Sequence, residues 1–187
     1  MAEFTVYDEE TAPEQAREML AGAKRRLGFV STLAGVMAES PELLAGYNLL
    51  FEKFQASSLP GPAKHVVLIT ASVANECSYC VAAHSTMALR AGLDQETVAK
   101  LRDGKPLDDP ALEAMRAFTK AVADGRGWVD DAGVDAFLAA GFSRRQLLDV
   151  VLGVGVKTLS NYTNHIASTP LDPAWAAQEW TPRQGHR

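Results

Sequence analysis

Apolar residues recur along most of the chain at intervals of three and four positions, and turn or capping residues separate these stretches. Two of the separating segments have the spacing of a capping box, Thr11 with Glu14 and Ser143 with Gln146. No convincing pair of strands remains. The sequence therefore predicts an all-α helical bundle with helices near residues 13–27, 30–39, 41–56, 62–75, 78–91, 94–102, 110–124, 130–140 and 143–166.

Residues 66–74 are the one ambiguous stretch, because their β-branched side chains would suit a strand. The stretch contains no turn signal, and its length favours a buried helix. The Pro- and Gly-containing turn at 58–62 is followed directly by helix signals, so we do not interpret it as a domain linker. We expect one domain over residues 1–187, made of N-terminal helices in 1–58, a core in 60–168 and a C-terminal extension in 169–187.

The composition is that of an ordinary soluble domain, with 47% hydrophobic and 22% charged residues. The formal charge is -5, and it is spread along the chain without a basic block, which argues against nucleic-acid binding. The first ten residues are acidic rather than basic and then apolar, and the most apolar run, 66–74, is too short to span a bilayer. We expect a cytoplasmic protein without a membrane anchor.

Two cysteines and a histidine carry the clearest chemical signal in the chain. Cys77, Cys80 and His84 form a C-x-x-C-x-x-x-H pattern, and on a helix these steps of three and four place all three side chains on one face. A helix N-terminus stabilises a thiolate, and a histidine one turn later can take or share the thiol proton. The second cysteine can then close a disulfide onto an oxidised first one. The pattern therefore suits a peroxide-consuming or dithiol-exchange cycle.

Three other interpretations compete with the redox one. A zinc site would use Cys77, Cys80, His84 and a fourth ligand such as His65, but the second closely spaced ligand pair of a structural zinc site is missing. Haem attachment of the c type needs a histidine directly after the second cysteine, where the chain has Val81. The two thiols could also simply pack in a core helix as small apolar groups. We expect neither a metal nor another cofactor.

Residues 76–85, with the sequence ECSYCVAAHS, resemble the C-x-Y-C-x-x-A-H core of the alkylhydroperoxidase D-like (AhpD-like) proteins in the carboxymuconolactone decarboxylase superfamily. A weaker likeness continues to residues 161–167. The resemblance implies an AhpD-like helical bundle, with the C-x-x-C motif at the N-terminus of a buried helix, that assembles as a homo-oligomer (dimer, trimer or hexamer). It also implies a thiol peroxidase cycle in which Cys80 is the peroxidatic cysteine, Cys77 supplies a proton and resolves the sulfenic acid, and His84 helps to deprotonate the thiol.

The chain departs from this family at one position of the proton relay. The family usually has a glutamate twelve residues before the first cysteine, and this chain has His65 there. A histidine can still pass a proton near neutral pH, and the equally weighted alternative is a helix-end histidine at the surface. Glu76 could substitute for the missing glutamate, but a negative neighbour raises a thiol pKa.

The last long helix and the motif itself supply candidates for a pocket. Asn161, Tyr162, Asn164 and His165 gather near the end of that helix, and Tyr79 lies between the two cysteines. The polar cluster on the last helix could line a pocket, with His165 orienting a cysteine, or could satisfy helix-terminal carbonyls. In the same helix residues 153–158 superficially resemble a phosphate loop but lack its pattern, so the two glycines there more simply permit close helix packing.

These features together predict an enzyme, a thiol-dependent peroxidase or disulfide oxidoreductase that reduces peroxide or alkyl hydroperoxides. Its partner would be a dithiol reductant, thioredoxin-like or lipoyl. A non-catalytic redox-sensing or ligand-binding helical oligomer is one alternative. The other is a cofactor-free lyase of the carboxymuconolactone decarboxylase type, in which the histidines and Glu76 transfer protons.

Overall fold

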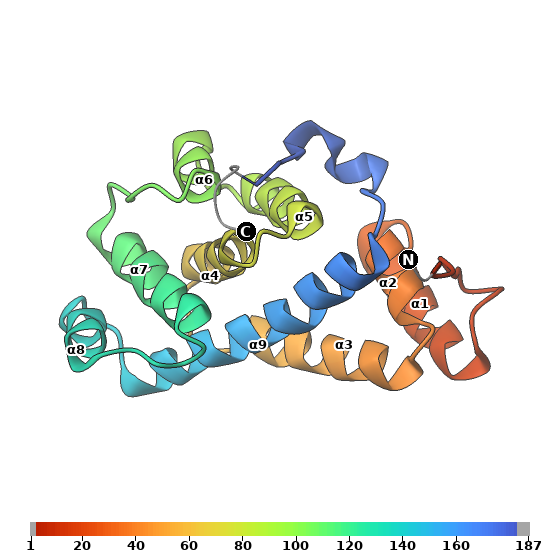
Figure 1. Ribbon diagram of the computed structural model, residues 1–187, viewed down its shortest axis with the longest axis horizontal. Coiled ribbons are helices and arrows are strands. Elements are labelled where there is room, and N and C mark those ends of the chain that lie inside the picture. The colour runs from red at the N-terminus through yellow and green to blue at the C-terminus, as the bar shows by residue number, and fades with distance from the viewer. Residues whose placement is uncertain (1–2, 183–187) are drawn as a thin grey trace.

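A computed structural model describes residues 3–182, and this part of the chain consists of helices joined by short connections, with no strand (Figure 1). The last residues of the expected extension, 183–187, lie outside it. The predicted all-α fold and the predicted helices are confirmed to within a few residues. The elements are α1 (Glu14–Leu27), α2 (Thr32–Met37), α3 (Pro41–Gln55), α4 (Gly61–Ala74), α5 (Ser78–Arg90), α6 (Gln95–Arg102), α7 (Pro110–Asp124), α8 (Asp131–Ala139), α9 (Arg144–Ala167) and a short 3-10 helix, η1 (Pro173–Gln178).

Helix α4 is the centre of the larger hydrophobic core. The ambiguous stretch 66–74 belongs to it, and the residues from Val66 to Ser72 are all buried. A helix that is apolar all round needs cover on every side, and α4 receives it from α5, α7 and α9 (Figure 1). The absence of alternating polar positions therefore reflects a buried helix and not a buried strand.

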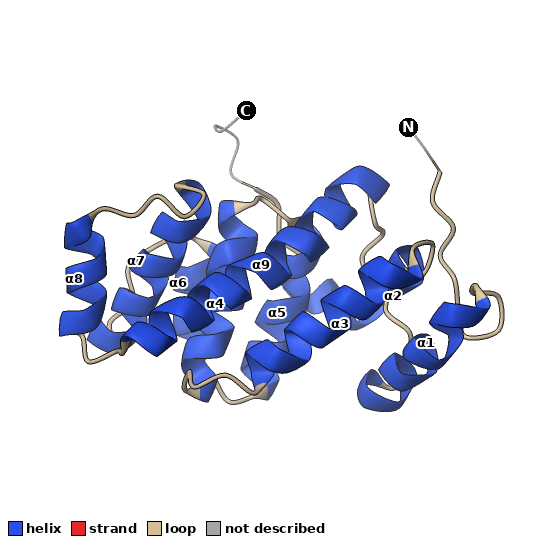
Figure 2. Cartoon of the chain, turned by 90° about the horizontal axis from the view of Figure 1, so that it is seen from below, coloured by secondary structure: helices blue, strands red, loops and turns tan. Residues whose placement is uncertain are grey.

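Helix α9 is the longest element and connects the two ends of the molecule. It begins with the predicted capping box of Ser143 and Gln146 and packs along α3 and across α4. A Cβ atom on Gly153 would lie 2.6 Å from side-chain atoms of Phe54 and of Val67, so this glycine permits the close approach of α9 to α3 and α4. The sequence also predicted close helix packing at Gly155, and this prediction is wrong because Gly155 faces open space. In Figure 2 α8 and α1 lie at opposite ends of the molecule, with α9 between them.

A second, smaller core is built from α1, α2, α5 and η1, and it contains both cysteines. Trp175 of η1 is 1% exposed and contacts Phe29 at a ring distance of 5.5 Å. The hydroxyl of Tyr79 donates to Asp172, and Asp172 also accepts from the backbone N–H and hydroxyl of Thr32. The C-terminal segment is thereby fastened over α5 and α2, as the tryptophans of that segment suggest.

No helix among residues 3–182 is both long and apolar enough to cross a membrane.

Candidate active site

The two cysteines lie side by side at the start of α5. Cys77 is the N-cap residue and Cys80 lies in the first turn, with the sulfurs 3.5 Å apart. Both thiols are free, and each residue is only 1% exposed. The N-terminal backbone N–H groups of a helix favour negative charge on a nearby thiol. The expected position of the motif at the beginning of a buried helix is what the structure shows.

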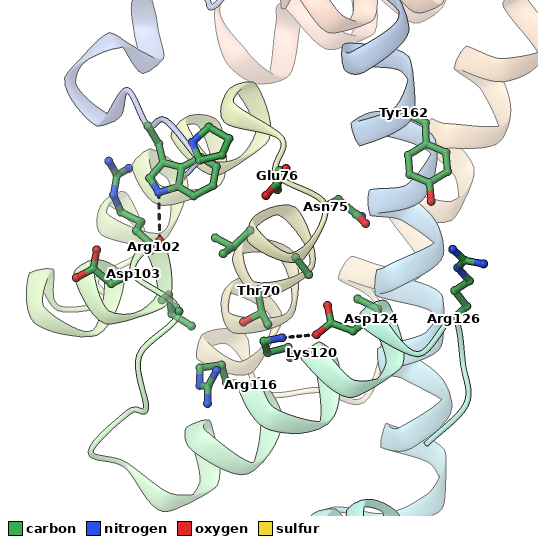
Figure 3. A pocket seen from close by; sticks show the side chains of 17 residues that line it. Thr70, Asn75, Glu76, Arg102, Asp103, Arg116, Lys120, Asp124, Arg126 and Tyr162 are labelled. Carbon is green, nitrogen blue, oxygen red and sulfur yellow. Dashed lines mark hydrogen bonds and ion pairs between the residues drawn. The ribbon is translucent and has the colours of Figure 1, made fainter. Parts of the chain in front are cut away.

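The connection between α4 and α5 sets the direction of these thiols. The N–H of Cys77 donates to the carbonyl of Ser72, and Glu76 has a left-handed φ of 54°. This is the hydrogen-bond pattern of a Schellman helix end, which reverses the chain within two residues. The reversal turns Cys77 into the smaller core and leaves Glu76 half-buried on the outer side, where it lines a surface groove (Figure 3).

Polar residues of α9 form the other wall of the thiol site. The Asn164 side-chain Nδ2 lies 3.2 Å from the Cys80 sulfur and 3.6 Å from the Cys77 sulfur. The Ser160 hydroxyl oxygen lies 3.8 Å from the Cys80 sulfur. Both residues are buried, so α9 supplies the hydrogen-bonding groups that meet the cysteine pair.

Lys157 is the most unusual member of this wall. Its side chain is completely buried, and its Nζ lies 2.8 Å from Nε2 of His84. Lysine is almost never fully buried without a partner of opposite charge or a strong hydrogen bond. In the sequence, Lys157 stands out only as part of the failed phosphate-loop pattern of residues 153–158. The available signal was the spacing of Lys157, Ser160 and Asn164, which places three polar side chains on one face of an otherwise apolar helix.

The surroundings shift the pKa values of the two thiols in opposite directions. Burial alone raises the pKa of Cys80, but the hydrogen bond with Cys77 and the positive charge of Lys157 outweigh burial and bring that pKa to about 5. The same hydrogen bond, burial and the charge on Cys80 all raise the pKa of Cys77. Cys80 is therefore the thiolate near neutral pH, and Cys77 is the thiol that donates to it.

His84 lies one turn after Cys80 on the same face, but its contact is with Lys157 and not with a sulfur. Burial first, and then the charges of Lys157 and His65, hold the pKa of His84 well below its usual range. The lowered pKa favours the neutral imidazole, in which Nε2 accepts from Nζ of Lys157 when Nδ1 carries the proton. Among the described residues this buried Nδ1 has no hydrogen-bond partner.

His65 lies on α4 near enough to influence the charge of His84. It is partly buried, and burial lowers its pKa. Its Nδ1 is also buried and has no partner in the described part of the chain. His65 is thus not a freely solvated surface histidine.

Of the five residues expected to line a pocket, Asn164 meets the sulfurs, and the other four do not form one cavity. The Tyr79 hydroxyl donates a hydrogen bond to Asp172, and the Oδ1 of buried Asn161 accepts from Asn75 at 2.9 Å. Tyr162 and His165 are exposed, and their rings stack at a distance of 6.5 Å. The exposed position of His165 separates it from the buried sulfurs.

A groove of about 700 Å³ lies on the outer side of the connection between α4 and α5. Figure 3 shows Asn75 and Glu76 between Arg102 on one side and Arg126 with Tyr162 on the other. The cysteines are not among its lining residues. The groove reaches the backbone of the motif from outside, while the sulfurs face inward.

No group of three or more His, Cys, Asp or Glu side chains within residues 3–182 is arranged to hold a metal ion.

Comparisons with known proteins relate the chain to one family and to several solved structures. Residues 41–124 match the carboxymuconolactone decarboxylase family. A peroxidase-related protein from Ralstonia eutropha JMP134 with an alkylhydroperoxidase AhpD core is 18% identical, with a TM-score of 0.82 over 98% of this chain and 100% of that one. A peroxidase-related protein from Silicibacter sp. TM1040 is 18% identical, with a TM-score of 0.79 over 95% and 96% of the two chains.

A third solved structure is the debrominase Bmp8 in complex with 2,3,4-tribromopyrrole, which is 20% identical with a TM-score of 0.81 over 95% of this chain and 96% of that one. No curated protein sequence matches the chain. At these identities the solved structures establish the fold, and the family match covers α3 to α7, including the cysteine pair and His84.

Proposed function

We propose that the chain, which matches the carboxymuconolactone decarboxylase family over residues 41–124 and has the fold of AhpD-like proteins, is a thiol-dependent peroxidase or disulfide oxidoreductase. The observation that carries this proposal is the pairing of unlike thiols. A stabilised thiolate at Cys80 lies 3.5 Å from a protonated thiol at Cys77. This is the arrangement that a two-cysteine peroxidatic cycle requires.

In the first step the Cys80 thiolate attacks the terminal oxygen of a hydroperoxide. The O–O bond breaks, Cys80 becomes a sulfenic acid, and the alkoxide leaves as an alcohol after taking one proton. In the second step the Cys77 thiol condenses with the sulfenic acid, which forms the disulfide and releases water. A dithiol reductant then exchanges with the disulfide and returns both cysteines to thiols.

The remaining polar residues fit supporting roles in this cycle. Asn164, with its Nδ2 within 3.6 Å of both sulfurs, orients them toward each other. His84 and His65 lead from the site toward the surface and provide a route for the proton that the leaving alkoxide needs. Glu76 faces the groove and not the sulfurs, so we assign it to contacts with the reductant or substrate and not to activation of the thiol.

Burial of both cysteines restricts what can react with them. At 1% exposure, neither sulfur is open to a large reagent without local movement of the covering segments. The cover comes from α1, α2 and η1, which form the smaller core around the pair. A compact hydroperoxide therefore suits the site better than a bulky disulfide substrate does.

The test is the consumption of cumene hydroperoxide and hydrogen peroxide in the presence of a dithiol, by the wild type and two single variants. Cys80→Ser should lower the rate at least a hundredfold, because no thiolate remains at the attacking position. Cys77→Ser should retain the first oxidation but lose the disulfide. His165→Asn is the matched control and should leave the rate unchanged, since the ring is exposed. Equal peroxide consumption by Cys80→Ser and the wild type would exclude the proposed mechanism.

The same assay separates the proposal from other chemistries of this fold. The debrominase among the similar structures makes a bromopyrrole a useful second substrate, because a dithiol pair can also deliver two electrons to a carbon–bromine bond. Bromide release without peroxide consumption would move the assignment to reductive dehalogenation. Activity toward a carboxylated substrate that survives in the Cys77→Ser/Cys80→Ser double variant would favour the lyase alternative.

A further inference from the structure

The buried Lys157 has no carboxylate partner among the described residues. Its side chain is 0% exposed, and the contact that the structure gives it is with the neutral imidazole of His84. Desolvating an ammonium group costs several kcal/mol, and burial without an anion nearby leaves that cost uncompensated. The anion that lies nearby is the Cys80 thiolate: His84 follows Cys80 by one turn of α5, and Ser160, one turn after Lys157 on α9, has its hydroxyl oxygen 3.8 Å from the Cys80 sulfur. The charge of Lys157 favours the ionised form of that thiol.

We propose that Lys157 is the positioning residue of this site: its buried ammonium group is a permanent counter-ion that keeps Cys80 ionised and occupies the Nε2 atom of His84. This inference rests on the proposed function in naming Cys80 as the nucleophile. It assigns the activation of the thiol to a lysine from α9, and not to the histidine of the C-x-x-C-x-x-x-H motif.

Packing of α9 fixes the ammonium group in this place. Gly153 permits the close contact of α9 with α3 and α4, and Lys157 follows one helical turn later on the same side. Its hydrogen bond to His84 ties the end of the long side chain to α5. The position of the charge is therefore set by two helices before any substrate arrives, which is the condition for electrostatic preorganisation.

The other lysines and arginines of α3, α4 and α5 have partners elsewhere: Lys53 pairs with Glu52, Lys64 donates to the carbonyl of Gln55, and Arg90 lies over the ring of Trp175. The titratable groups that act on the cluster are Tyr47 of α3, His65 of α4, and the cysteines and His84 of α5. Helix α2 contains no charged or titratable side chain. The charged residues of α7, which also packs on α9, pair with one another as Glu113–Arg116 and Lys120–Asp124.

The kind of counter-ion determines the pH dependence of the thiol. If an imidazolium stabilised the thiolate, reactivity would change near the ordinary pKa of histidine, about 6.5. If the counter-ion is the lysine ammonium and not an imidazolium, no such step is expected, and the reactivity of Cys80 should stay constant between about pH 6 and pH 8.5. A buried pair is also weakly screened, and the reactivity should be insensitive to added salt.

The experiment measures the rate of alkylation of Cys80 by iodoacetamide and its thiolate absorbance at 240 nm from pH 4.5 to pH 10. All proteins carry Cys77→Ser, so that one thiol is observed. Lys157→Met keeps the length of the side chain and removes its charge. It should raise the midpoint of the profile above that of the parent and slow alkylation at pH 7 at least tenfold, while the rate at pH 10 matches the parent. A purely structural defect would not restore the rate at high pH.

Two further variants separate the lysine from the histidine and from a general loss of charge. Lys53→Met removes an exposed lysine of α3 and should leave the profile unchanged. His84→Gln keeps the ammonium group and should leave the midpoint at the value of the parent. A profile for Lys157→Met like that of its parent, or an equal upward shift in His84→Gln, would overturn the proposal.

If Lys157→Met does not fold, the pH profile of the Cys77→Ser parent alone still tests the proposal. A thiolate signal that disappears on acidification through pH 6.5, or one that is absent below pH 8, contradicts a permanent counter-ion. Alkylation requires no peroxide. A shifted profile in a protein that fails to consume peroxide would therefore refute the proposed function and leave the role of Lys157 intact.

Discussion

At the scale of single residues, His84 links the chemistry of the site to the stability of the fold. Its pKa lies well below 6.5, chiefly because burial opposes the imidazolium form and secondly because Lys157 is close. In the unfolded chain the same ring titrates near 6.5. Below that pH the unfolded chain therefore binds a proton that the folded chain does not bind, and the free energy of unfolding falls as the pH falls.

Cys80 acts in the same direction over a wider range. Its pKa in the folded protein, about 5, lies below the value of 9.0 for a free thiol. The stability that this thiolate contributes is fully present above the pKa of the unfolded thiol and is lost as the pH falls toward 5. Acidification from pH 7 to pH 5 should thus weaken the fold through both groups.

The variant His84→Gln tests this linkage. It should reduce the slope of the unfolding free energy against pH between 6.5 and 5.5 by up to about 1.4 kcal/mol per pH unit, the effect of one proton. The measurement is urea denaturation at a series of pH values, and His165→Gln, with an exposed ring, serves as the control. An unchanged slope in His84→Gln would show that the imidazole is not held neutral in the folded state.

The sequence predicted the residues of the motif but only part of the site. The spacing of Cys77, Cys80 and His84 identified the thiols and their shared helix face, because these residues are local in sequence. Lys157 and Asn164 approach the sulfurs only after α9 has packed on α5, and no local pattern specifies that approach. The exposed stacking of Tyr162 and His165 likewise depends on which face of α9 the bundle covers.

At the scale of helices, most boundaries followed from capping chemistry, and one such prediction was wrong. Ser143 and Gln146 form the predicted capping box. Thr11 does not cap α1; the N-cap residue is Pro13, without a side-chain hydrogen bond, and the Thr11 hydroxyl interacts with Asp8. A turn stabilised by an aspartate side chain competes for the same threonine, and the four-residue spacing does not distinguish the two.

Gly153 and Gly155 provide a matched pair of variants on one helix. Gly153→Ala should destabilise the protein by about 1–2 kcal/mol, because the new methyl group would overlap Phe54 and Val67. Gly155→Ala meets open space and should stabilise by up to about 1 kcal/mol through helix propensity. Thermal and urea unfolding measure both. Equal effects of the two substitutions would contradict the close packing of α9 against α3 and α4.

At the scale of the whole molecule, α9 presents an exposed apolar stripe that the single chain does not cover. Leu148, Val151, Tyr162 and Ile166 lie on one face of the helix and are 66%, 47%, 54% and 69% exposed. Such contiguous apolar surface is typical of an interaction site. With the AhpD-like fold, it supports the expectation that a second copy of the chain covers α9.

We expect Leu148→Arg/Ile166→Arg to dissociate this homo-oligomer, because two charges would be buried at opposite ends of the stripe. Size-exclusion chromatography with light scattering measures the mass, and Leu27→Arg, an exposed leucine at the end of α1, serves as the control. A wild-type protein that is monomeric at about 100 μM would refute the expectation, since specific oligomers normally form well below that concentration.

Local sequence patterns say least about how the helices pack against one another. The contact of Asp172 with Tyr79 and Thr32 joins segments far apart in the chain, and it closes the smaller core over the cysteines. The sequence indicated that the segment with Trp175 is fastened to the body, since a large aromatic is costly to expose. Its docking over α5 depends on complementary shape and hydrogen bonding, which a pattern of residue types does not encode.

The central claim is that Cys80 and Cys77 complete one redox cycle together. The most direct measurement is to mix reduced protein with one equivalent of an alkyl hydroperoxide near neutral pH and to follow free thiols while mapping the products by mass spectrometry. The account predicts loss of both thiols within seconds, a disulfide between Cys77 and Cys80, one equivalent of alcohol, and full recovery with a dithiol. Both thiols remaining free for many minutes, with the hydroperoxide unconsumed, would contradict it.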